Sequence, residues 1–365
     1  MNQSDSADHN DTLTSGISAP PMPGSAMTAD IASQPKVYAH FVDSQGAHVA
    51  QVAAAIAQNR PKSIVFVARG TSAHAALYGA YLAEVRLGLR ASIAAPSSIT
   101  LYGARHEFAD CLVVGVSQSG GSPDIDQVLQ AAGASGAQTL AITNNSDSAL
   151  AHTAHHHIDL QAGKELAVAA TKTYTSELLA LLLLIEGIRG RDPQVDAFVA
   201  DLPELARTVL DDPAPGQLAS RYRFASQMIT TGRGLGYPTA RETALKLMET
   251  SYLPVLAFSG ADLLHGPLAM VDSQLPILAF MGNGPGGAAM VEVAQRLSQQ
   301  QADLVTIGPK GTDAAVHALA TPDVEERFSP LLDVLPMQQL ALSMALQRGQ
   351  NPDAPRGLQK VTKTV

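Results

Sequence analysis

The feature of this sequence that most limits its fold is a regular alternation of short apolar runs with longer amphipathic segments. The runs in the first half are "KSIVFVARG", "CLVVGVSQ", "TLAITNN" and "HHIDL", and each is followed by a segment rich in Ala and Leu. Short apolar runs bounded by turn residues are typical of buried strands, and the longer segments are typical of helices. The alternation predicts an α/β fold in which helices wrap a mostly parallel sheet.

The same alternation starts again in the second half of the chain. Three pairs of similar runs share an offset of 164 residues: "FVARG" with "TTGRG", "VVGV" with "ILAF", and "LAIT" with "LVTI". A chain of 365 residues is also longer than one hydrophobic core usually supports. The repeat predicts two similar subdomains, over about residues 35–200 and 210–350, that join near "DDPAPGQ".

The composition excludes several classes of function. The formal charge is −9 and no basic cluster is present, so we expect no nucleic-acid partner. The greasiest segment, residues 178–185, is far shorter than the roughly 20 residues of a membrane span, so we expect no membrane partner. The first residues lack the apolar stretch of a secretory signal, and the single Cys111 is expected to be an inert core thiol in a reducing cytoplasm.

The first 32 residues differ from the rest of the chain. They are rich in Ser, Asp, Gly and Pro, as in "SGISAPPMPGSAMTAD", and they show no sustained apolar period. Such a composition is typical of disordered segments. Residues 1–32 are therefore predicted to form a flexible N-terminal tail.

Hydroxyl and glycine residues follow two of the predicted strands. One loop contains Gly70, Thr71 and Ser72, and the other is "SQSGGS" at residues 117–122. Short hydroxyl side chains beside glycines allow O–H and backbone N–H groups to surround a tetrahedral anion. Because both loops follow strands of one parallel sheet, we expect them to lie together and to bind the phosphate of a small metabolite.

Two observations qualify this hypothesis. Ser, Thr and Gly also cap helices and form turns without any ligand. However, the second copy of the repeat has Met281, Gly282, Asn283 and Gly286 where the first has Ser117, Gln118, Ser119 and Ser122, so only the first half keeps the hydroxyls. Neither loop matches a P-loop or a dinucleotide-binding fingerprint, which favours a small phosphorylated metabolite over a nucleotide.

The segment "YPTARETALKLMETSY", residues 237–252, is predicted to be a helix with three charged residues on one face. Glu242, Lys246 and Glu249 are spaced at i, i+4 and i+7. This spacing also occurs on ordinary solvated helix faces, where the charges form ion pairs. His265 follows in the apolar setting of "LLHGPLAM", and a carboxylate, an amine and an imidazole together form a proton-transfer set.

Several motifs in this order resemble the sugar isomerase (SIS) double-domain family, and in particular the isomerase half of glucosamine-fructose-6-phosphate aminotransferase. The motifs are "GTS", "SQSG", "ELAVAATKTYT", "ALKLMETSY", "HGPLAMV" and "PRGLQKVTKTV". The resemblance runs from about residue 32 to the last residue. It implies two SIS subdomains, each with a doubly wound, flavodoxin-like sheet, followed by a lid-like C-terminal tail at residues 351–365.

The resemblance also implies roles for individual residues. The sugar-phosphate cradle is matched by Ser72, Ser117, Gln118, Ser119 and Ser122, and the backbone that approaches the sugar by Val168 and Ala170. Glu249 matches the carboxylate that moves a proton between C1 and C2, and Lys246 its amine partner. His265 matches a ring-opening imidazole from the neighbouring subunit, which implies a homodimer. Lys360 matches a lysine that can form a Schiff base with a ketose phosphate, and no metal or other cofactor is implied.

The departures from the family pattern suggest the direction of the reaction. The family's acidic residue after "SQSG" is Gly121 here, a change that bears on fine substrate specificity and not on the cradle. The polar N-terminal segment does not resemble a glutaminase domain, so glutamine is not expected to supply ammonia within this chain. We therefore expect a glucosamine-6-phosphate deaminase. The alternatives are a fructosamine-6-phosphate deglycase, a galactosamine-6-phosphate deaminase and a non-enzymatic sugar-phosphate sensor.

Two further groups of residues invite a hypothesis. "HTAHHH" at residues 152–157 could suggest a metal site, but consecutive strand residues alternate faces and no cysteine joins them, so we expect no metal there. Lys164, Glu165 and Lys172 flank the "ELAVAATK" loop and could contact the ligand.

Overall fold

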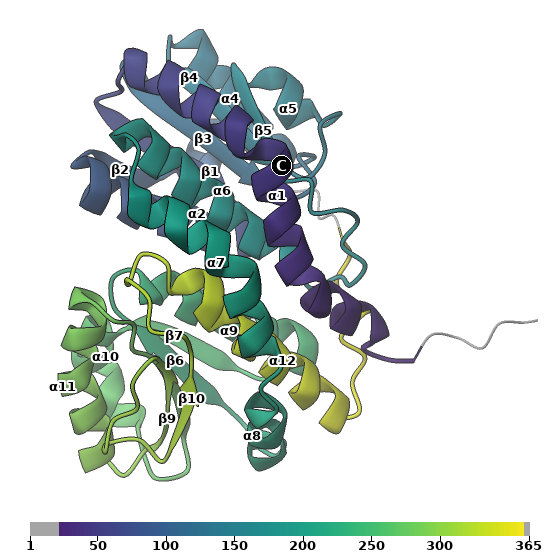
Figure 1. Ribbon diagram of the computed structural model, residues 1–365, viewed down its shortest axis with the longest axis vertical. Coiled ribbons are helices and arrows are strands. Elements are labelled where there is room, and N and C mark those ends of the chain that lie inside the picture. The colour runs from purple at the N-terminus through teal and green to yellow at the C-terminus, as the bar shows by residue number, and fades with distance from the viewer. Residues whose placement is uncertain (1–21, 361–365) are drawn as a thin grey trace, which may run out of the picture.

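The computed structural model describes residues 22–360, which fold into two α/β units, one above the other in Figure 1. The first unit contains α1 (Ser25–Gln58), β1 (Ser63–Ala68), α2 (Gly70–Leu82), the π-helical turn η1 (Ala83–Leu87), β2 (Arg90–Ile93), α3 (Pro96–Thr100), β3 (Cys111–Ser117), α4 (Pro123–Ala134), β4 (Gln138–Thr143), α5 (Ala149–Thr153), β5 (His156–Asp159), α6 (Lys172–Arg189) and α7 (Pro193–Leu210). The second contains α8 (Ala214–Tyr222), β6 (Met228–Gly232), α9 (Gly236–Ser251), β7 (Val255–Ser259), α10 (Gly260–Leu264), the 3₁₀ turn η2 (Pro267–Met270), β8 (Pro276–Phe280), α11 (Pro285–Gln299), β9 (Asp303–Gly308), β10 (His317–Ala320) and α12 (Pro330–Gln347).

Each unit is built on one five-stranded sheet. The strand order is β2-β1-β3-β4-β5 in the first sheet and β7-β6-β8-β9-β10 in the second, and every neighbouring pair is parallel. Counted from the start of each half, the two orders are identical, and they are the order of flavodoxin-like folds. The predicted fold class, with two parallel sheets flanked by helices, is therefore confirmed.

The strand register tests the predicted repeat residue by residue. Phe66 pairs with Val114 in the first sheet, and the residues 164 positions later, Thr230 and Leu278, pair in the second. The third predicted pair is wrong by one residue: Val114 pairs with Leu140, whereas Leu278 pairs with Val305 rather than with residue 304. The connection between β8 and β9 is thus one residue longer than its counterpart between β3 and β4.

Both faces of each sheet are covered by helices. Along β3, Val114 faces the core formed with α1, α2 and α6, whereas its neighbour Val113 faces the smaller core formed with α4. The second sheet divides its residues in the same way, between α8, α9 and α12 on one face and α11 on the other. Strands buried on both faces explain why the sequence shows continuous apolar runs rather than an alternating pattern.

The most apolar segment of the chain lies inside this core. Residues 178–185 form the middle of α6, and nearly all of them are fully buried. No helix within residues 22–360 combines the length and the apolar character that crossing a membrane requires. The apolar run thus belongs to the packing of the first unit.

The two units meet through equivalent helices. α2 follows the first strand of its unit and α9 follows the first strand of the other, and these two helices pack against each other. α12 packs along another side of α9 and contributes Leu331 and Leu335 to the first core. Because α9 is covered from both sides, its charged face is placed at the boundary between the units.

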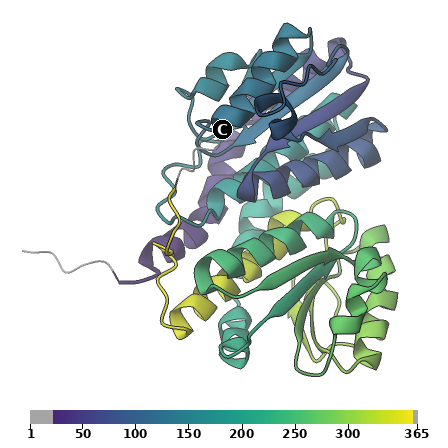
Figure 2. The ribbon, with the colours of Figure 1, turned by 180° about the vertical axis from the view of Figure 1, so that it is seen from behind.

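The first helix begins earlier than the sequence suggested. α1 starts at Ser25, so the predicted flexible tail is wrong for residues 25–32, where Met27 and Ile31 are buried. The C-terminal segment stabilises this start, because the Asp353 carboxylate accepts hydrogen bonds from the backbone N–H groups of Ala26 and Met27 at 3.1 and 2.8 Å. Figure 2 shows the C-terminal segment in yellow passing the start of α1. Residues 1–21 of the predicted tail and residues 361–365 of the predicted lid lie outside the described residues.

Candidate active site

A cavity of about 340 Å³ lies at the carboxyl ends of β1 and β3, where the strand order of the first sheet changes direction. This position is the usual ligand site of open parallel sheets. Eleven of the thirteen predicted site residues line it: Gly70, Thr71, Ser72, Ser117, Gln118, Ser119, Ser122, Val168, Ala170, Glu249 and Lys360. Arg69, Leu358 and Gln359 also line it and were not predicted. Lys246 lies behind this lining, and His265 lies outside it.

The hydroxyl groups around the cavity fall into two classes. The Ser72 hydroxyl donates to the buried Glu177 at 2.7 Å, and the Thr71 hydroxyl donates to Glu242 at 3.1 Å, so both already have acceptors within the protein. Ser117 and Ser119 instead accept hydrogen bonds from backbone N–H groups, and among residues 22–360 their own hydroxyls donate to no protein acceptor. Free hydroxyl donors for an anion are thus concentrated in the loop after β3.

The shape of this loop depends on a glycine. Gly120 has a φ of 62°, in the left-handed region that favours glycine. A Cβ at this position would overlap with the side chain of Ser148, which is the N-cap of α5. The close approach allows the backbone of the loop to fold tightly over the carboxyl end of β3.

Buried charges from α9 lie beside the cavity. The Lys246 ammonium donates to Glu249 Oε2 at 2.5 Å and lies 3.4 Å from Glu242 Oε1. The side chains of Glu242 and Lys246 are 0 and 1 % exposed, whereas that of Glu249 is 22 % exposed. The solvated-face alternative is therefore wrong for this helix, because α2 covers the charges. Glu249 is the member of the set that reaches the cavity.

Burial and charge act on Lys246 in opposite directions. Burial by itself disfavours the ammonium, but the carboxylates of Glu242 and Glu249 raise the pKa of Lys246 above its ordinary value. Lys246 therefore stays protonated. This ammonium holds the Glu249 carboxylate in place through its hydrogen bond.

A histidine that was not predicted from the sequence completes this array. His74 Nδ1 lies 2.8 Å from Glu242 Oε2, and the imidazole is almost fully buried. His74 follows Thr71 by three residues on α2, so both side chains lie on the helix face that meets α9. That spacing was visible in the sequence, but the partner carboxylate is 168 residues away.

Glu177 is a second buried acid beside the array. Burial raises its pKa well above the ordinary value, and the Ser72 hydrogen bond only partly offsets this effect. The neighbouring carboxylates of Glu165 and Glu242 raise it further. Glu177 therefore supports the start of α2 by accepting from the Ser72 hydroxyl, and burial favours its neutral form.

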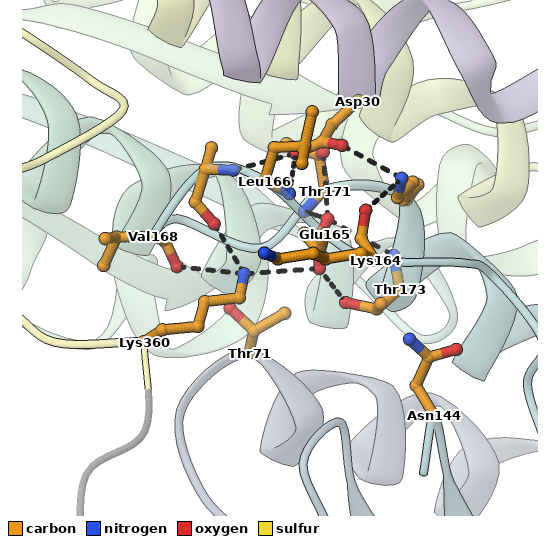
Figure 3. Close-up of polar contacts among 12 residues, drawn as sticks. Asp30, Thr71, Asn144, Lys164, Glu165, Leu166, Val168, Thr171, Thr173 and Lys360 are labelled. Atoms are coloured by element: carbon orange, nitrogen blue, oxygen red, sulfur yellow. Dashed lines mark hydrogen bonds and ion pairs between the residues drawn. The ribbon is translucent and has the colours of Figure 1, made fainter.

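The tail lysine reaches the cavity from the C-terminal segment. Lys360 Nζ donates to the backbone carbonyl of Ala167 at 2.6 Å and lies 3.7 Å from Glu165 Oε2 (Figure 3). Burial lowers the pKa of Lys360, although Glu165 and Asp30 oppose the effect. A lowered pKa increases the fraction of neutral amine, which is the form that can attack a carbonyl.

The loop that carries Val168 is held from α1. The Asp30 carboxylate accepts hydrogen bonds from the backbone N–H groups of Leu166 and Ala167, and it pairs with Lys172 (Figure 3). Glu165 accepts hydrogen bonds from Thr171 and Thr173 in the same view. Lys172 and Glu165 thus shape the loop from behind. Glu165 and Lys164 line a neighbouring polar cavity of about 510 Å³ that shares Gln118 and Lys360 with the first.

The equivalent place in the second unit is filled by the protein itself. The Glu326 carboxylate accepts hydrogen bonds from the backbone N–H groups of Gly286 and Gly287, at 3.1 and 2.8 Å, at the start of α11. A Cβ at Gly284 or Gly286 would overlap with this carboxylate. The second unit therefore supplies its own anion where the first unit has an open cavity.

His265 stands apart from the cavity. It is exposed at the end of α10 and does not line the cavity within this chain. The predicted contribution of His265 across a dimer interface stays a prediction.

The clustered histidines make separate local contacts. His157 Nε2 lies 2.9 Å from the Thr143 hydroxyl, His155 Nδ1 lies 3.0 Å from the Thr139 hydroxyl, and His152 Nδ1 donates to the Ser148 carbonyl. Within residues 22–360, no three potential metal ligands among His, Cys, Asp and Glu come together.

Comparisons with known proteins identify the family of the chain. The SIS domain family matches residues 59–187 and 222–348. The chain is 37 % identical over 311 residues to the glutamine–fructose-6-phosphate aminotransferase of Gloeobacter violaceus, a match that covers 81 % of this chain and 51 % of that protein. The chain thus spans about half the length of the curated relatives it matches.

Two solved structures extend the comparison. A proposed phosphosugar isomerase from Silicibacter pomeroyi DSS-3 is 31 % identical with a TM-score of 0.83, over 90 % of this chain and 99 % of that one. The C-terminal domain of glucosamine-fructose-6-phosphate aminotransferase from Francisella tularensis is 26 % identical with a TM-score of 0.82, over 90 and 98 %. The family match falls once on each α/β unit, so the chain belongs to the SIS domain family and contains two SIS subdomains.

Proposed function

We propose that this protein is an amino-sugar phosphate deaminase that converts D-glucosamine 6-phosphate and water to fructose 6-phosphate and ammonia. The observation that carries the proposal is the position of Glu249. Its carboxylate reaches the same cavity as the hydroxyl loops, and the buried ammonium of Lys246 holds it there. A carboxylate fixed beside an anion-binding loop can act on the carbon atoms of a sugar whose phosphate is anchored.

The loop after β3 is the proposed phosphate site. Ser117 and Ser119 have free hydroxyl donors, and Ser122 is the N-cap of α4 without using its side chain to cap the helix. Hydroxyl groups together with the N–H groups at a helix start suit a phosphate dianion. Anchoring the phosphate places the opposite end of the open-chain sugar toward Glu249.

Glu249 is the proposed acid–base residue. In the open-chain aldehyde form of the substrate, its carboxylate removes the proton from C2 and returns it to C1. The C1 carbonyl oxygen gains a proton and the C2 amino group loses one, so that the double bond moves through an enolamine from the C1 carbonyl to the C2–nitrogen bond and a ketimine forms. Water then adds to C2 of the ketimine, and ammonia leaves, so that the C2 ketone of fructose 6-phosphate remains.

Lys360 and His265 are the proposed assisting groups. Lys360 faces the cavity, and its lowered pKa suits it to form a Schiff base with the C2 ketone in the reverse direction. His265 is exposed, and in our proposal it opens the sugar ring in the cavity of a second copy of the chain. The proposed assembly is therefore a homodimer.

The proposed reaction releases free ammonia. The one cysteine, Cys111, is the first residue of β3, and its thiol lies 3.2 Å from the Ser63 hydroxyl. The cavity lies at the opposite end of that strand, after Ser117. No step of the proposed reaction uses glutamine.

The test is ammonia release from glucosamine 6-phosphate by the purified full chain. Glu249→Gln keeps the shape of the side chain but cannot shuttle a proton, so we expect kcat to fall about 10²- to 10⁴-fold while substrate affinity stays within a few-fold. Glu292→Gln, at an exposed position on α11, is the matched control and should retain wild-type kcat. Substantial turnover by Glu249→Gln would contradict the assigned role.

Parallel substrates separate the alternatives. Galactosamine 6-phosphate, fructoselysine 6-phosphate and unphosphorylated glucosamine are assayed beside glucosamine 6-phosphate. Release of free lysine from fructoselysine 6-phosphate, with no ammonia from the other substrates, would identify a deglycase. Equal rates with and without the phosphate would contradict the cradle. No turnover of any of the four compounds, together with a rise in the Tm of the protein on adding a sugar phosphate, would identify a sensor.

A further inference from the structure

Arg69 places a guanidinium group beside the proposed phosphate loop. It is the N-cap residue of α2, directly after β1, and it lines the same cavity as Ser117, Ser119 and Ser122. Its side chain is 50 % exposed. Arg69 belongs to the run "FVARG", but no role has been assigned to it, so the cavity contains a cation that the proposed function has not used.

A buried carboxylate fixes the orientation of this guanidinium. Arg69 Nε donates to Asp124 Oδ2 at 2.8 Å, and the Asp124 side chain is only 1 % exposed. Asp124 lies in the first turn of α4, so the ion pair connects the loop after β1 to the helix after β3. Within residues 22–360, the remaining N–H groups of Arg69 donate to no protein acceptor. The Asp124 side of the ion pair is buried, whereas Arg69 is half exposed and lines the cavity.

The cavity needs such a group if it binds a phosphate dianion. The donors of the loop after β3 are neutral hydroxyl and amide groups. The other two cations are already engaged, since Lys246 pairs with Glu249 and Lys360 lies among backbone carbonyls and Glu165. A guanidinium can donate two parallel hydrogen bonds to phosphate oxygens, which a lysine ammonium cannot do in the same fixed geometry.

We propose that Arg69 is a phosphate-binding residue that makes the site selective for the dianionic phosphoryl group, and that Asp124 is its positioning residue. This inference rests on the proposed function in placing the phosphate in this cavity. Arg69 and Asp124 are neutral as a pair, but the positive end borders the cavity and the negative end is buried. The pair thus adds directed donors without adding net charge to the site.

Binding of inorganic phosphate and of glucosamine 6-phosphate, measured by calorimetry, tests the inference without requiring turnover. For Arg69→Gln we expect the Kd of both ligands to rise about 10- to 100-fold, the range that corresponds to losing hydrogen bonds to a charged group. The loss for glucosamine 6-phosphate should be larger at pH 8 than at pH 5.5, because the second ionisation of a phosphate monoester has a pKa near 6. Arg90→Gln, at an exposed position on the opposite end of the first sheet, is the matched control.

Two further variants separate binding from folding. Arg69→Ala should recover part of its phosphate affinity when guanidinium ions are added at about millimolar concentration, which a misfolded site would not do. Asp124→Asn should weaken phosphate binding less than Arg69→Gln and should flatten its pH dependence, because the guanidinium loses its fixed orientation. Circular dichroism spectra like that of wild type for all variants would show that the fold is kept.

The outcomes distinguish this inference from the proposed function. Phosphate affinity that depends on Arg69 in a protein that releases no ammonia supports the inference and contradicts the deaminase. Ammonia release together with phosphate binding that is unchanged within two-fold in Arg69→Gln overturns the inference alone. The inference is also overturned if Arg69→Gln binds phosphate normally and guanidinium ions do not restore phosphate binding to Arg69→Ala.

Discussion

Asp333 is expected to make the protein less stable as the pH rises. It lies in the first turn of α12, almost fully buried, and it accepts a hydrogen bond from the Thr321 hydroxyl at 2.7 Å. Burial raises its pKa from 3.8 to about 7, the Thr321 hydrogen bond opposes this, and the nearby Glu326 adds to it. The folded protein therefore keeps this carboxyl neutral over a pH range in which the unfolded chain ionises it.

The sign and the size of the effect follow from that difference. Between pH 3.8 and about 7 the folded state binds one more proton than the unfolded state, so the free energy of unfolding falls as the pH rises through this window. Each pKa unit corresponds to about 1.4 kcal/mol, which gives about 4 kcal/mol over the whole window and about 3 kcal/mol between pH 5 and pH 8. The loss levels off above the folded-state pKa.

Asp333→Asn removes the ionisation while its side-chain oxygen can still accept from Thr321. We expect the free energy of unfolding of this variant, minus that of wild type, to be about 3 kcal/mol larger at pH 8 than at pH 5, because only wild type loses stability over this range. Urea unfolding followed by circular dichroism at both values measures it. Asp313→Asn, at an exposed position of the same unit, is the control and should show less than about 0.5 kcal/mol of change. If Asp333→Asn changed the free energy of unfolding by the same amount at both pH values, the Asp333 carboxyl would be ionised in the folded protein. That result would refute the reasoning.

Two other predictions concern the anion sites of the two units. Ser119→Ala combined with Ser122→Ala removes hydroxyl groups from the proposed phosphate loop, so the KM for glucosamine 6-phosphate should rise about 10- to 100-fold with little change in kcat; an unchanged KM in steady-state kinetics would contradict the cradle. Glu326→Ala removes the carboxylate that Gly286 and Gly287 hold, and should lower the free energy of unfolding by about 2–4 kcal/mol. Added acetate or phosphate should then raise the Tm of Glu326→Ala in a saturable way and leave wild type unaffected, and an equal response of both proteins would argue against an anion site there.

The sequence was a good guide where local pattern and global fold agree. β1, β3 and β4 could be located because strands buried on both faces read as continuous apolar runs, and the loops that follow them carry the hydroxyls. The spacing of Glu242, Lys246 and Glu249 likewise placed three charges on one face of α9. Each of these features depends on residues close together in the chain.

The features that the sequence did not show depend on residues far apart. The pattern of Glu242 and Lys246 is that of a solvated face, and only the packing of α2 from the other unit makes it a buried array. The start of α1 resembles a flexible tail because its helical turn depends on Asp353, more than 300 residues later. Arg69 could not be recognised as a site residue from the sequence, because its partner Asp124 lies on a different helix, α4.

The contacts of Asp353 join the two ends of the described chain to the proposed sugar site. Its carboxylate caps α1, and its backbone carbonyl accepts a hydrogen bond from Val168 at 3.2 Å, in the loop that lines the cavity. Residues 358–360 of the same segment line that cavity. A movement of the segment large enough to displace Asp353 would therefore also uncap α1 and release the loop. Opening of the site and fraying of the first helical turn would then be one cooperative event, so the stability of the chain ends would set how readily the cavity exchanges its contents with solvent.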